Sequence, residues 1–368
     1  MSSDVVDLTS ALMAIDSVNP SLVPGGAGET AIAAHVTEWA CNQGLEADML
    51  EATPGRPSVL VRARGTGGGR TLLLCGHLDT VSVEGLDAPF TPRRDGDRLY
   101  GRGGYDMKGG VAAALVAARD AARLGLAADV VVAAVADEEH ASLGVQEALR
   151  HVQADAAIVT EPTELEVLVA HKGFIWAEVT VRGKAAHCSQ PDVGVDAIVK
   201  AAPLLAGIGA LDEQLTRNLH PLLGRGSVHA GTIRGGVEQS SYPAECVVAV
   251  ERRTLPGETA ATFEAELAAV AGDATVVTTL VREPFEIDPS DALVGAVVDA
   301  AASVTGTRPS IGGAGYWADA AFIAAAGIPT VMFGPTGEGA HAVDEWVSVS
   351  SIEKVARTLT AVAAKLCA

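Results

Sequence analysis

Residues 71–80 read T-L-L-L-C-G-H-L-D-T: an apolar run that leads through a glycine into a histidine and an aspartate. This run predicts a strand. The run V-V-V-A-A-V-A at 130–136 does not alternate, as expected of a strand buried on both faces, and A-A-I-V-T at 156–160 predicts a shorter one. Between the first two runs, the alanine-rich residues 112–124 predict a helix. Strands that alternate with helices indicate a mostly parallel α/β sheet.

The composition is that of an ordinary globular protein with an acidic surface. At 368 residues, with 48% apolar and 20% charged residues, the chain can form two domains with a real core. The formal net charge of −20 argues against nucleic acid and anionic membranes as partners. We recognise no signal peptide and no apolar run long enough to span a bilayer. The five cysteines are odd in number and scattered, so we expect free thiols in a reducing cytoplasm.

The hydrophobic pattern changes near residue 173 and returns to its first form near residue 284. Residues 174–183 and 244–253 alternate between apolar and polar, as expected of strands with one face in water. A helical pattern follows each of them. We therefore expect one domain made of residues 1–173 and 284–368, interrupted by a smaller α+β domain at 174–283.

Side chains that can bind metals follow each of the buried runs. A histidine and an aspartate follow the first, a D-E-E run follows the second, and a glutamate follows the third. Another histidine comes shortly after P-T-V-M-F at 329–333. In open α/β sheets, ligands bind outside the carboxyl ends of the strands. We therefore expect one site at this edge, formed by His77, Asp79, Glu138, Glu139, Glu161 and His341.

Asp106 comes from a fifth segment, G-R-G-G-Y-D-M-K-G-G at 101–110, just before the predicted helix. Taken alone, Asp106 could equally be a helix N-cap or a turn residue. His77 could likewise end a strand in an ordinary polar loop, and the D-E-E run could be a solvated turn. The convergence of five segments favours a functional site over these alternatives.

Two histidines and three carboxylates suit a pair of divalent metals such as zinc. Each metal would take one histidine and one glutamate, and a carboxylate would bridge the two. Asp79 is suited to accept the free ring N–H of His77, which would fix the tautomer of the ring. Glu138 and Glu139 point in different directions, so one can bind metal while the other acts as general base on the attacking water.

The chain resembles the two-zinc aminoacylase/carboxypeptidase metallohydrolase family in five segments. They occur in the family's order between residues 76 and 345: G-H-L-D-T-V, G-R-G-G-Y-D-M-K-G-G, A-D-E-E, T-E-P-T and G-A-H-A-V-D-E. The family includes acetylornithine deacetylase, succinyl-diaminopimelate desuccinylase, aminoacylases and glutamate carboxypeptidases. The resemblance implies a mostly parallel-sheet catalytic domain of zinc-aminopeptidase type, made of 1–173 and 284–368. The insertion 174–283 would be an α+β lid and dimerisation domain.

The resemblance also implies two zinc ions per chain, for which cobalt could substitute. One ion would be held by His77 and Glu161 and the other by Glu139 and His341, with Asp106 as the bridge between them.

Further roles follow from the same resemblance. Glu138 would be the general base, and Asp79 would orient His77. In the lid, His187 of G-K-A-A-H-C-S-Q-P matches a histidine that stabilises the oxyanion, in many members across a dimer. Arg253 matches an arginine that can grip a substrate carboxylate. Without the resemblance, His187 reads as a loop residue and Arg253 as a surface arginine at a strand end.

The implied reaction is removal of an acyl group from an N-acyl amino acid, as in acetylornithine deacetylase, by a zinc-bridged hydroxide. Within the family, the alternatives are an N-succinyl amino acid desuccinylase and a dipeptidase or carboxypeptidase. From other classes, a phosphoesterase is opposed by the lack of a basic cluster near the proposed ligands. A non-catalytic metal-binding relative is opposed by the retention of every proposed ligand and of Glu138. We expect a small-molecule substrate and a homodimer formed through the lid.

The sequence departs from the family pattern at a few positions, none of them a proposed ligand. These are Ser82, Ala141, Thr336 and the stretch Y-W-A-D-A-A at 316–321. The last replaces the more usual G-G-T-D/E-A and lines the expected substrate pocket, so it leaves the identity of the substrate open.

Overall fold

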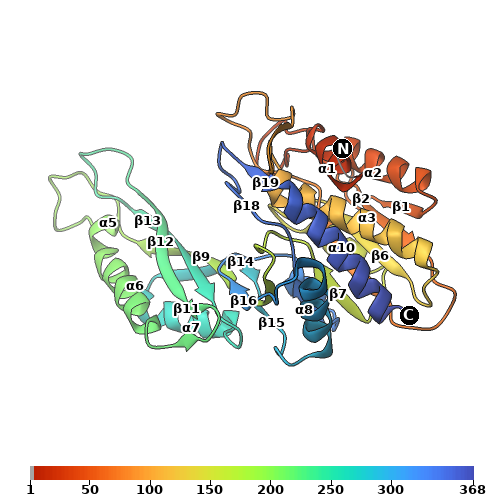
Figure 1. The fold of residues 1–368 in the computed structure, drawn as a ribbon. Helices are drawn as coiled ribbons and strands as arrows, with labels where there is room; N and C mark the ends of the chain where they lie inside the picture. The colour runs from red at the N-terminus through yellow and green to blue at the C-terminus, as the bar shows by residue number, and fades with distance from the viewer. Residues whose placement is uncertain (1–3) are drawn as a thin grey trace. The chain divides into compact units, whose positions relative to one another are not determined.

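The computed structural model describes residues 4–368, which form two compact units (Figure 1). The first unit contains residues 4–169, 287–312 and 318–368, and the second contains residues 170–286 and 313–317. The short segment 313–317 groups with the second unit, although the sequence analysis assigns it to the first domain.

A mixed sheet forms the centre of the first unit. Its strands lie in the order β1 (Glu46–Leu50), β2 (Ser58–Ala63), β6 (Val130–Val135), β3 (Leu72–His77), β7 (Ala156–Val159), β17 (Thr330–Met332) and β8 (Val167–His171). The central strands β6, β3, β7 and β17 are parallel, and the strands on either side run antiparallel to their neighbours. The predicted α/β architecture with a mostly parallel sheet is therefore confirmed.

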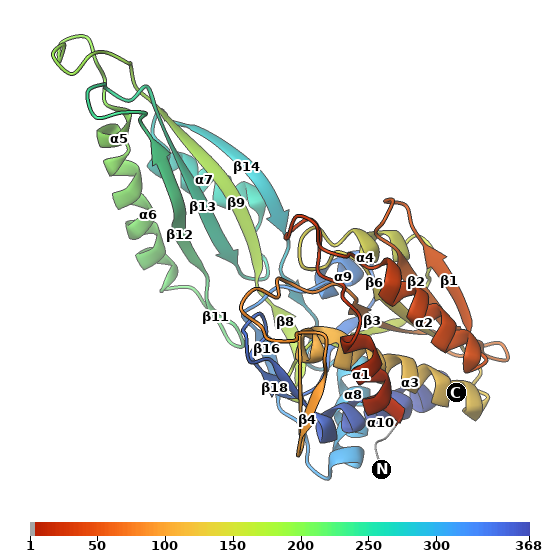
Figure 2. The ribbon, with the colours of Figure 1, turned by 90° about the horizontal axis from the view of Figure 1, so that it is seen from above.

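Helices cover both faces of this sheet. On one face, α10 (Val349–Leu366) packs against α3 (Gly109–Leu124) and α8 (Ala292–Thr305), and α1 (Asp4–Met13) contacts α3 and α10. Figure 2 shows α4 (Leu143–Ala148) and α9 (Ala320–Ala325) on the opposite face. α2 (Thr30–Asn42) packs against β1 and β2. Within residues 4–368, no helix combines the length and the apolar character needed to cross a bilayer.

The central strands are buried along their whole length, which explains why their sequences are continuous apolar runs. The first turn of α3 lies directly against the end of β7. A Cβ atom on Gly110 would come within 2.0 Å of the carbonyl oxygen of Thr160, so only glycine fits at this position. The paired glycines of the sequence thus bring the segment before α3 up to the edge of the sheet.

A small antiparallel sheet ties two distant segments of the first unit together. Its order is β18 (Gly337–Glu338), β19 (Trp346–Ser348), β5 (Arg98–Tyr100) and β4 (Arg93–Asp95). After β5, the chain passes through an irregular turn at Gly104–Lys108, in which the Asp106–Met107 peptide is cis. The loop between β18 and β19 is thereby held near this turn.

The second unit is built on a four-stranded antiparallel sheet in the order β12 (Ser227–Gly235), β13 (Glu245–Thr254), β9 (Gly173–Arg182) and β14 (Thr275–Arg282). β13 alternates between buried and partly exposed residues. Its buried side chains share a core with α6 (Ala202–Leu215) and α7 (Ala260–Ala271). The unit also contains α5 (Ala197–Lys200) and the hairpin of β10 (Leu219–His220) and β11 (Gly224–Arg225). β15 (Phe285–Glu286) and β16 (Ile311–Ala314) pair with β8, whose last two residues belong to this unit.

The strands β1, β8, β12 and β14 are not evident from the hydrophobic pattern. β12 reads S-V-H-A-G-T-I-R-G and is exposed over most of its length, so its pairing with β13 rather than its own pattern makes it a strand. The helical pattern that follows residues 174–183 corresponds to two helices, α5 and α6, and α6 carries a proline in its first turn.

Candidate metal centre

Four neighbouring parallel strands deliver polar residues to one edge of the first unit's sheet. Because β6, β3, β7 and β17 are parallel and adjacent, their carboxyl ends lie on the same side. Glu138 and Glu139 lie in the turn after β6, His77 is the last residue of β3, and Glu161 follows β7. His341 comes from farther along the chain after β17, in the loop between β18 and β19.

Asp106 lies between the two histidines. Its Oδ1 atom is 3.1 Å from Nε2 of His77, and its Oδ2 atom is 3.2 Å from Nε2 of His341. His341 Nε2 is also 3.2 Å from Oε2 of Glu139. The two oxygens of one carboxylate thus face two separate imidazoles, which is the arrangement expected of a group that bridges two ions.

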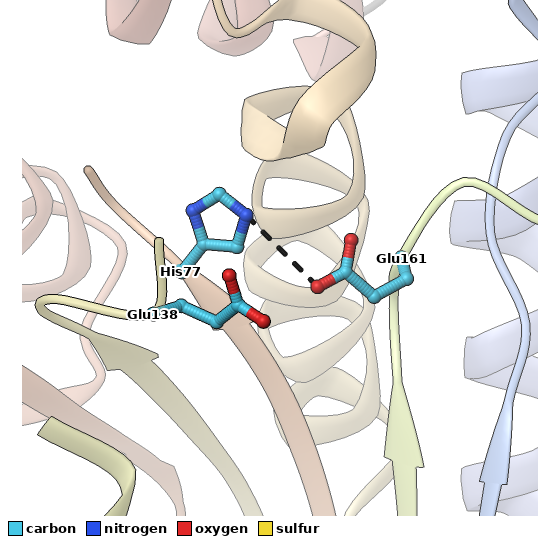
Figure 3. A group of neighbouring side chains, drawn as sticks. All are labelled: His77, Glu138 and Glu161. Carbon is cyan, nitrogen blue, oxygen red and sulfur yellow. Dashed lines mark ion pairs between the residues drawn. The ribbon is translucent and has the colours of Figure 1, made fainter. Parts of the chain in front are cut away.

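Glu138 and Glu161 complete the other side of the cluster around His77 (Figure 3). Ligand atoms of these three residues all lie within 4.8 Å of one another, and the Nε2 atom of His77 is 3.9 Å from Oε1 of Glu161. Burial raises the pKa of Glu138 well above its usual range. The charge of His77 opposes this shift, whereas the charges of Glu161 and Asp319 add to it.

The two imidazoles respond to the surrounding negative charge. Burial alone would lower the pKa of His77, but its hydrogen bond with Asp106 and the charge of Glu161 hold that pKa well above its usual range. Hydrogen bonds with Asp106 and Glu139 raise the pKa of His341 to about 10. The surrounding carboxylates therefore favour positive charge at the positions of both imidazoles.

The carboxylate of Asp79 is turned toward the main chain of the glutamate pair. Its Oδ1 atom accepts the N–H of Glu138 at 3.1 Å, and its Oδ2 atom accepts the N–H of Glu139 at 3.2 Å. His77 Nδ1 lies 2.9 Å from the main-chain carbonyl of Asp79 and 3.7 Å from Oδ1. The carboxylate is the predicted partner of His77, whereas in the structure the carbonyl of the same residue makes the shorter contact.

A buried glutamate that the sequence analysis does not assign, Glu345, fixes the turn that carries Asp106. Its carboxylate accepts the main-chain N–H groups of Gly103, Tyr105 and Asp106 at 2.9–3.1 Å and pairs with Arg102 at 2.8 Å. The only signal for it in the sequence is its place at the end of G-A-H-A-V-D-E. Asp106 is thus held by a network of its own, separate from the main-chain contacts of Asp79.

The donor set fits two divalent cations. Imidazole nitrogens and carboxylate oxygens are the ligands that zinc takes in proteins. Metal binding would require neutral imidazoles and ionised carboxylates. In that state Asp106, Glu138, Glu139 and Glu161 would carry four negative charges, which two divalent cations would balance. Buried charges are costly unless they are paired, so this concentration of carboxylates is consistent with a metal centre.

The second unit carries the other two residues predicted for the site. His187 is exposed, and its Nδ1 atom accepts the main-chain N–H of Ser189 at 3.2 Å. Arg253 is partly buried; its Nε donates to Glu251 at 2.7 Å, and its guanidinium lies 5.0 Å from the centre of the Phe174 ring. Their part in the site stays a prediction.

We predict that Asp79→Asn leaves the protein folded but weakens zinc binding by about 10–100-fold, because an amide nitrogen would face an N–H group now held by the carboxylate. The measurement is a calorimetric titration of metal-stripped protein with zinc, together with thermal unfolding. Asp129→Asn is the matched control, since Asp129 also accepts a main-chain N–H, from Gly65, but precedes β6 at the strand's other end. Equal zinc affinity in both variants would contradict the role of Asp79.

Comparisons with known proteins place the chain in a family. The model of peptidase family M20/M25/M40 matches residues 73–365. Acetylornithine deacetylase of Myxococcus xanthus is 32% identical over 322 residues, which cover 82% of each chain. Succinyl-diaminopimelate desuccinylase of Stenotrophomonas maltophilia is 32% identical over 382 residues, covering 95% of this chain and 96% of that protein.

The fold is shared with solved structures as well. One is a Bacillus subtilis protein described as a dinuclear metal-binding peptidase of family M20, with a TM-score of 0.75, 13% identity, and coverage of 99% of this chain and 97% of that one. The family model spans all the residues gathered at the sheet edge, from His77 to His341. The chain therefore belongs to peptidase family M20/M25/M40, and it is a hydrolase that acts on amide bonds.

Proposed function

We propose that this protein removes the acyl group from an N-acyl amino acid with the help of two zinc ions. The observation that carries the proposal is the carboxylate of Asp106, which faces His77 with one oxygen and His341 with the other. His77 and Glu161 would hold one ion, and Glu139 and His341 the other. When bound, such a pair of ions activates a water molecule and polarises the carbonyl that is attacked.

Glu138 is the proposed general base of this reaction. It lies beside the proposed ligands His77 and Glu161, in the turn that follows β6, and its main-chain N–H is held by the carboxylate of Asp79. Its carboxylate oxygen would accept a proton from the attacking water and deliver it to the nitrogen of the leaving amine. Glu139 comes from the same turn, but its carboxylate is directed toward His341.

The hydrogen bonds of His187 are compatible with a role as oxyanion donor. Nδ1 of His187 accepts the main-chain N–H of Ser189 at 3.2 Å and lies 2.8 Å from the Ser189 hydroxyl, which can also donate to it. With Nδ1 as the acceptor, the neutral imidazole would carry its proton on Nε2. An Nε2–H group is a donor to the oxygen that becomes negative when a carbonyl is attacked. We propose that His187 serves this purpose.

Arg253 is proposed to bind the carboxylate of the amino acid. Glu251 takes only the Nε donor of its guanidinium, and the planar fork of arginine has further donors for a bidentate contact. The ring of Phe174 supports the guanidinium face. N-acetyl and N-succinyl amino acids and short peptides all carry such a carboxylate, and the names of the two relatives favour the first two classes.

A homodimer formed through the second unit is also part of the proposal. β12 is the outer strand of its sheet, and seven consecutive residues at 229–235 are exposed. An exposed strand edge of this length offers unpaired main-chain groups to a second strand. Sedimentation at micromolar concentration should therefore give a dimer, and a monomer would contradict the proposal.

A reducing compartment is consistent with the cysteines. All five are unpaired, and three of them are buried. We propose a cytoplasmic location, which fractionation of the native cells would test; recovery of the protein outside the cytoplasmic fraction would overturn it.

The substrate proposal is tested by a hydrolysis screen of N-acetyl, N-succinyl and N-formyl amino acids and dipeptides with zinc- and cobalt-loaded enzyme. We expect N-acyl amino acids to be cleaved fastest. Glu138→Gln should lower kcat by about 10²–10⁴-fold while the protein still binds two zinc ions, because it removes the base but none of the proposed ligands.

The matched control for this screen is Glu147→Gln on α4, whose carboxylate accepts the main-chain N–H of Ala52 on the surface. It should keep the kcat of the wild type. Full activity of Glu138→Gln would show that another group is the base, and preferential cleavage of dipeptides would show a peptidase instead of a deacylase.

A further inference from the structure

A network of buried, hydrogen-bonded side chains extends from the candidate metal centre and includes Asn19. The amide nitrogen of Asn19 donates to Oδ2 of Asp79 at 2.7 Å and to Oδ1 of Asp137 at 3.0 Å. All three side chains are fully buried. Asp137 directly precedes Glu138 in the sequence, and Asp79 accepts the main-chain N–H groups of Glu138 and Glu139. The side-chain amide of Asn19 therefore joins two carboxylates that contact this turn.

The main chain fixes the direction in which Asn19 points. Its N–H donates to the carbonyl of Thr80 at 2.8 Å, and its side-chain oxygen accepts the N–H of Ser21 at 2.9 Å. With the oxygen held in this way, the amide nitrogen can only face the carboxylates. Asn19 thus presents its two N–H groups to Asp79 and Asp137 at once.

Arg56 lies at the other end of this network, where it contacts Asp137 and Glu29. Its Nε and NH2 groups donate to the two oxygens of Glu29 at 2.8 and 2.7 Å, and NH2 also lies 2.8 Å from Oδ1 of Asp137. Its NH1 group donates to the hydroxyl of Ser21 at 3.0 Å. Arg56 is only 7% exposed, so its charge acts on these partners with little screening by water.

The turn at Asp137–Ser142, which this network contacts, contains a strained backbone conformation. Asp137 has a φ of +67°, a conformation that residues other than glycine rarely adopt. Its carbonyl accepts the N–H groups of Ala141 and Ser142 at 3.0 and 2.5 Å, which closes the turn around Glu138 and Glu139. A strained turn persists only where its surroundings hold it, and here Asn19 and Arg56 hold its first side chain.

We propose that Asn19 and Arg56 are positioning residues for the metal centre. Through Asp137 and Asp79 they set the place of the Glu138–Glu139 turn, and thereby of the proposed base and of one proposed ligand. The inference rests on the proposed two-metal function. Neither residue reaches the cluster itself, so both act through the carboxylates.

The test compares Asn19→Ala and Arg56→Lys with Arg119→Lys. Arg119 is the matched control because it is also 7% exposed and ion-paired, with Asp4 and Asp120, but on α3 away from the turn. The probe is zinc, titrated into metal-stripped protein by calorimetry at 25 °C. Thermal unfolding and far-UV circular dichroism are measured on the same samples, and kcat and KM on the best substrate of the screen.

We expect Asn19→Ala and Arg56→Lys each to weaken zinc binding or lower kcat by about 10–100-fold, with KM changed far less. Arg119→Lys should shift the unfolding midpoint without moving either quantity. If the Asn19 variant does not fold, the Arg56→Lys variant alone tests the proposal. Lysine keeps the positive charge and loses only the guanidinium group that contacts Glu29 and Asp137 together.

The inference is overturned if the folded variants bind zinc and turn over like Arg119→Lys while their unfolding midpoints fall, since that is the result of a purely structural role. A wild-type protein that binds fewer than two zinc ions would instead overturn the proposed function, and this inference with it. The two failures are therefore distinguishable from the wild-type titration alone.

Discussion

The structure of the first unit is organised around the Asp106 carboxylate, which contacts the imidazoles of His77 at the end of β3 and of His341 in the loop between β18 and β19. Asp106 reaches His77 and His341 only because α3 begins with glycines that fit against the end of β7 and because Glu345 holds the preceding turn. Around this carboxylate the protein gathers three glutamates at the edge of a sheet. Such a concentration of like charge is unfavourable in a buried place unless cations accompany it, and the fold supports it through the rigidity of four fully buried strands.

Much of this arrangement could be predicted from the sequence, for a physical reason. Strands buried on both faces need continuous apolar runs, so β3, β6 and β7 are visible as runs, and the residues just beyond them could be assigned to one edge. The roles of Asn19 and Arg56 could not be found in this way, because their partners are distant in the sequence. Asn19 is 60 residues from Asp79 and 118 residues from Asp137, and Arg56 is 27 residues from Glu29. Polar residues in loops show no periodicity, and only the tertiary fold gives them their contacts. The edge strand β12 was missed for a related reason: its neighbour makes it a strand.

The two units divide the proposed chemistry. The first contains every proposed metal ligand and the proposed base, and its positions are fixed by main-chain hydrogen bonds such as those from Glu138 and Glu139 to Asp79. The second contains His187 and Arg253, which would meet the oxyanion and the carboxylate of the substrate. Membership of the M20/M25/M40 family accounts for the shared fold and amide hydrolysis. The family does not fix the acyl group; the resemblance predicts that residues 316–321, where this chain departs from the family pattern, line the substrate pocket, and we expect them to contribute to that choice.

The central claim is that this edge of the sheet holds two zinc ions. The most direct measurement is a crystal of the zinc-loaded protein with diffraction recorded on both sides of the zinc absorption edge. We predict two anomalous peaks per chain about 3.5–4 Å apart, one beside His77 and Glu161 and the other beside Glu139 and His341, with Asp106 between them. A single peak at this site, or two peaks with other ligands, would contradict the account.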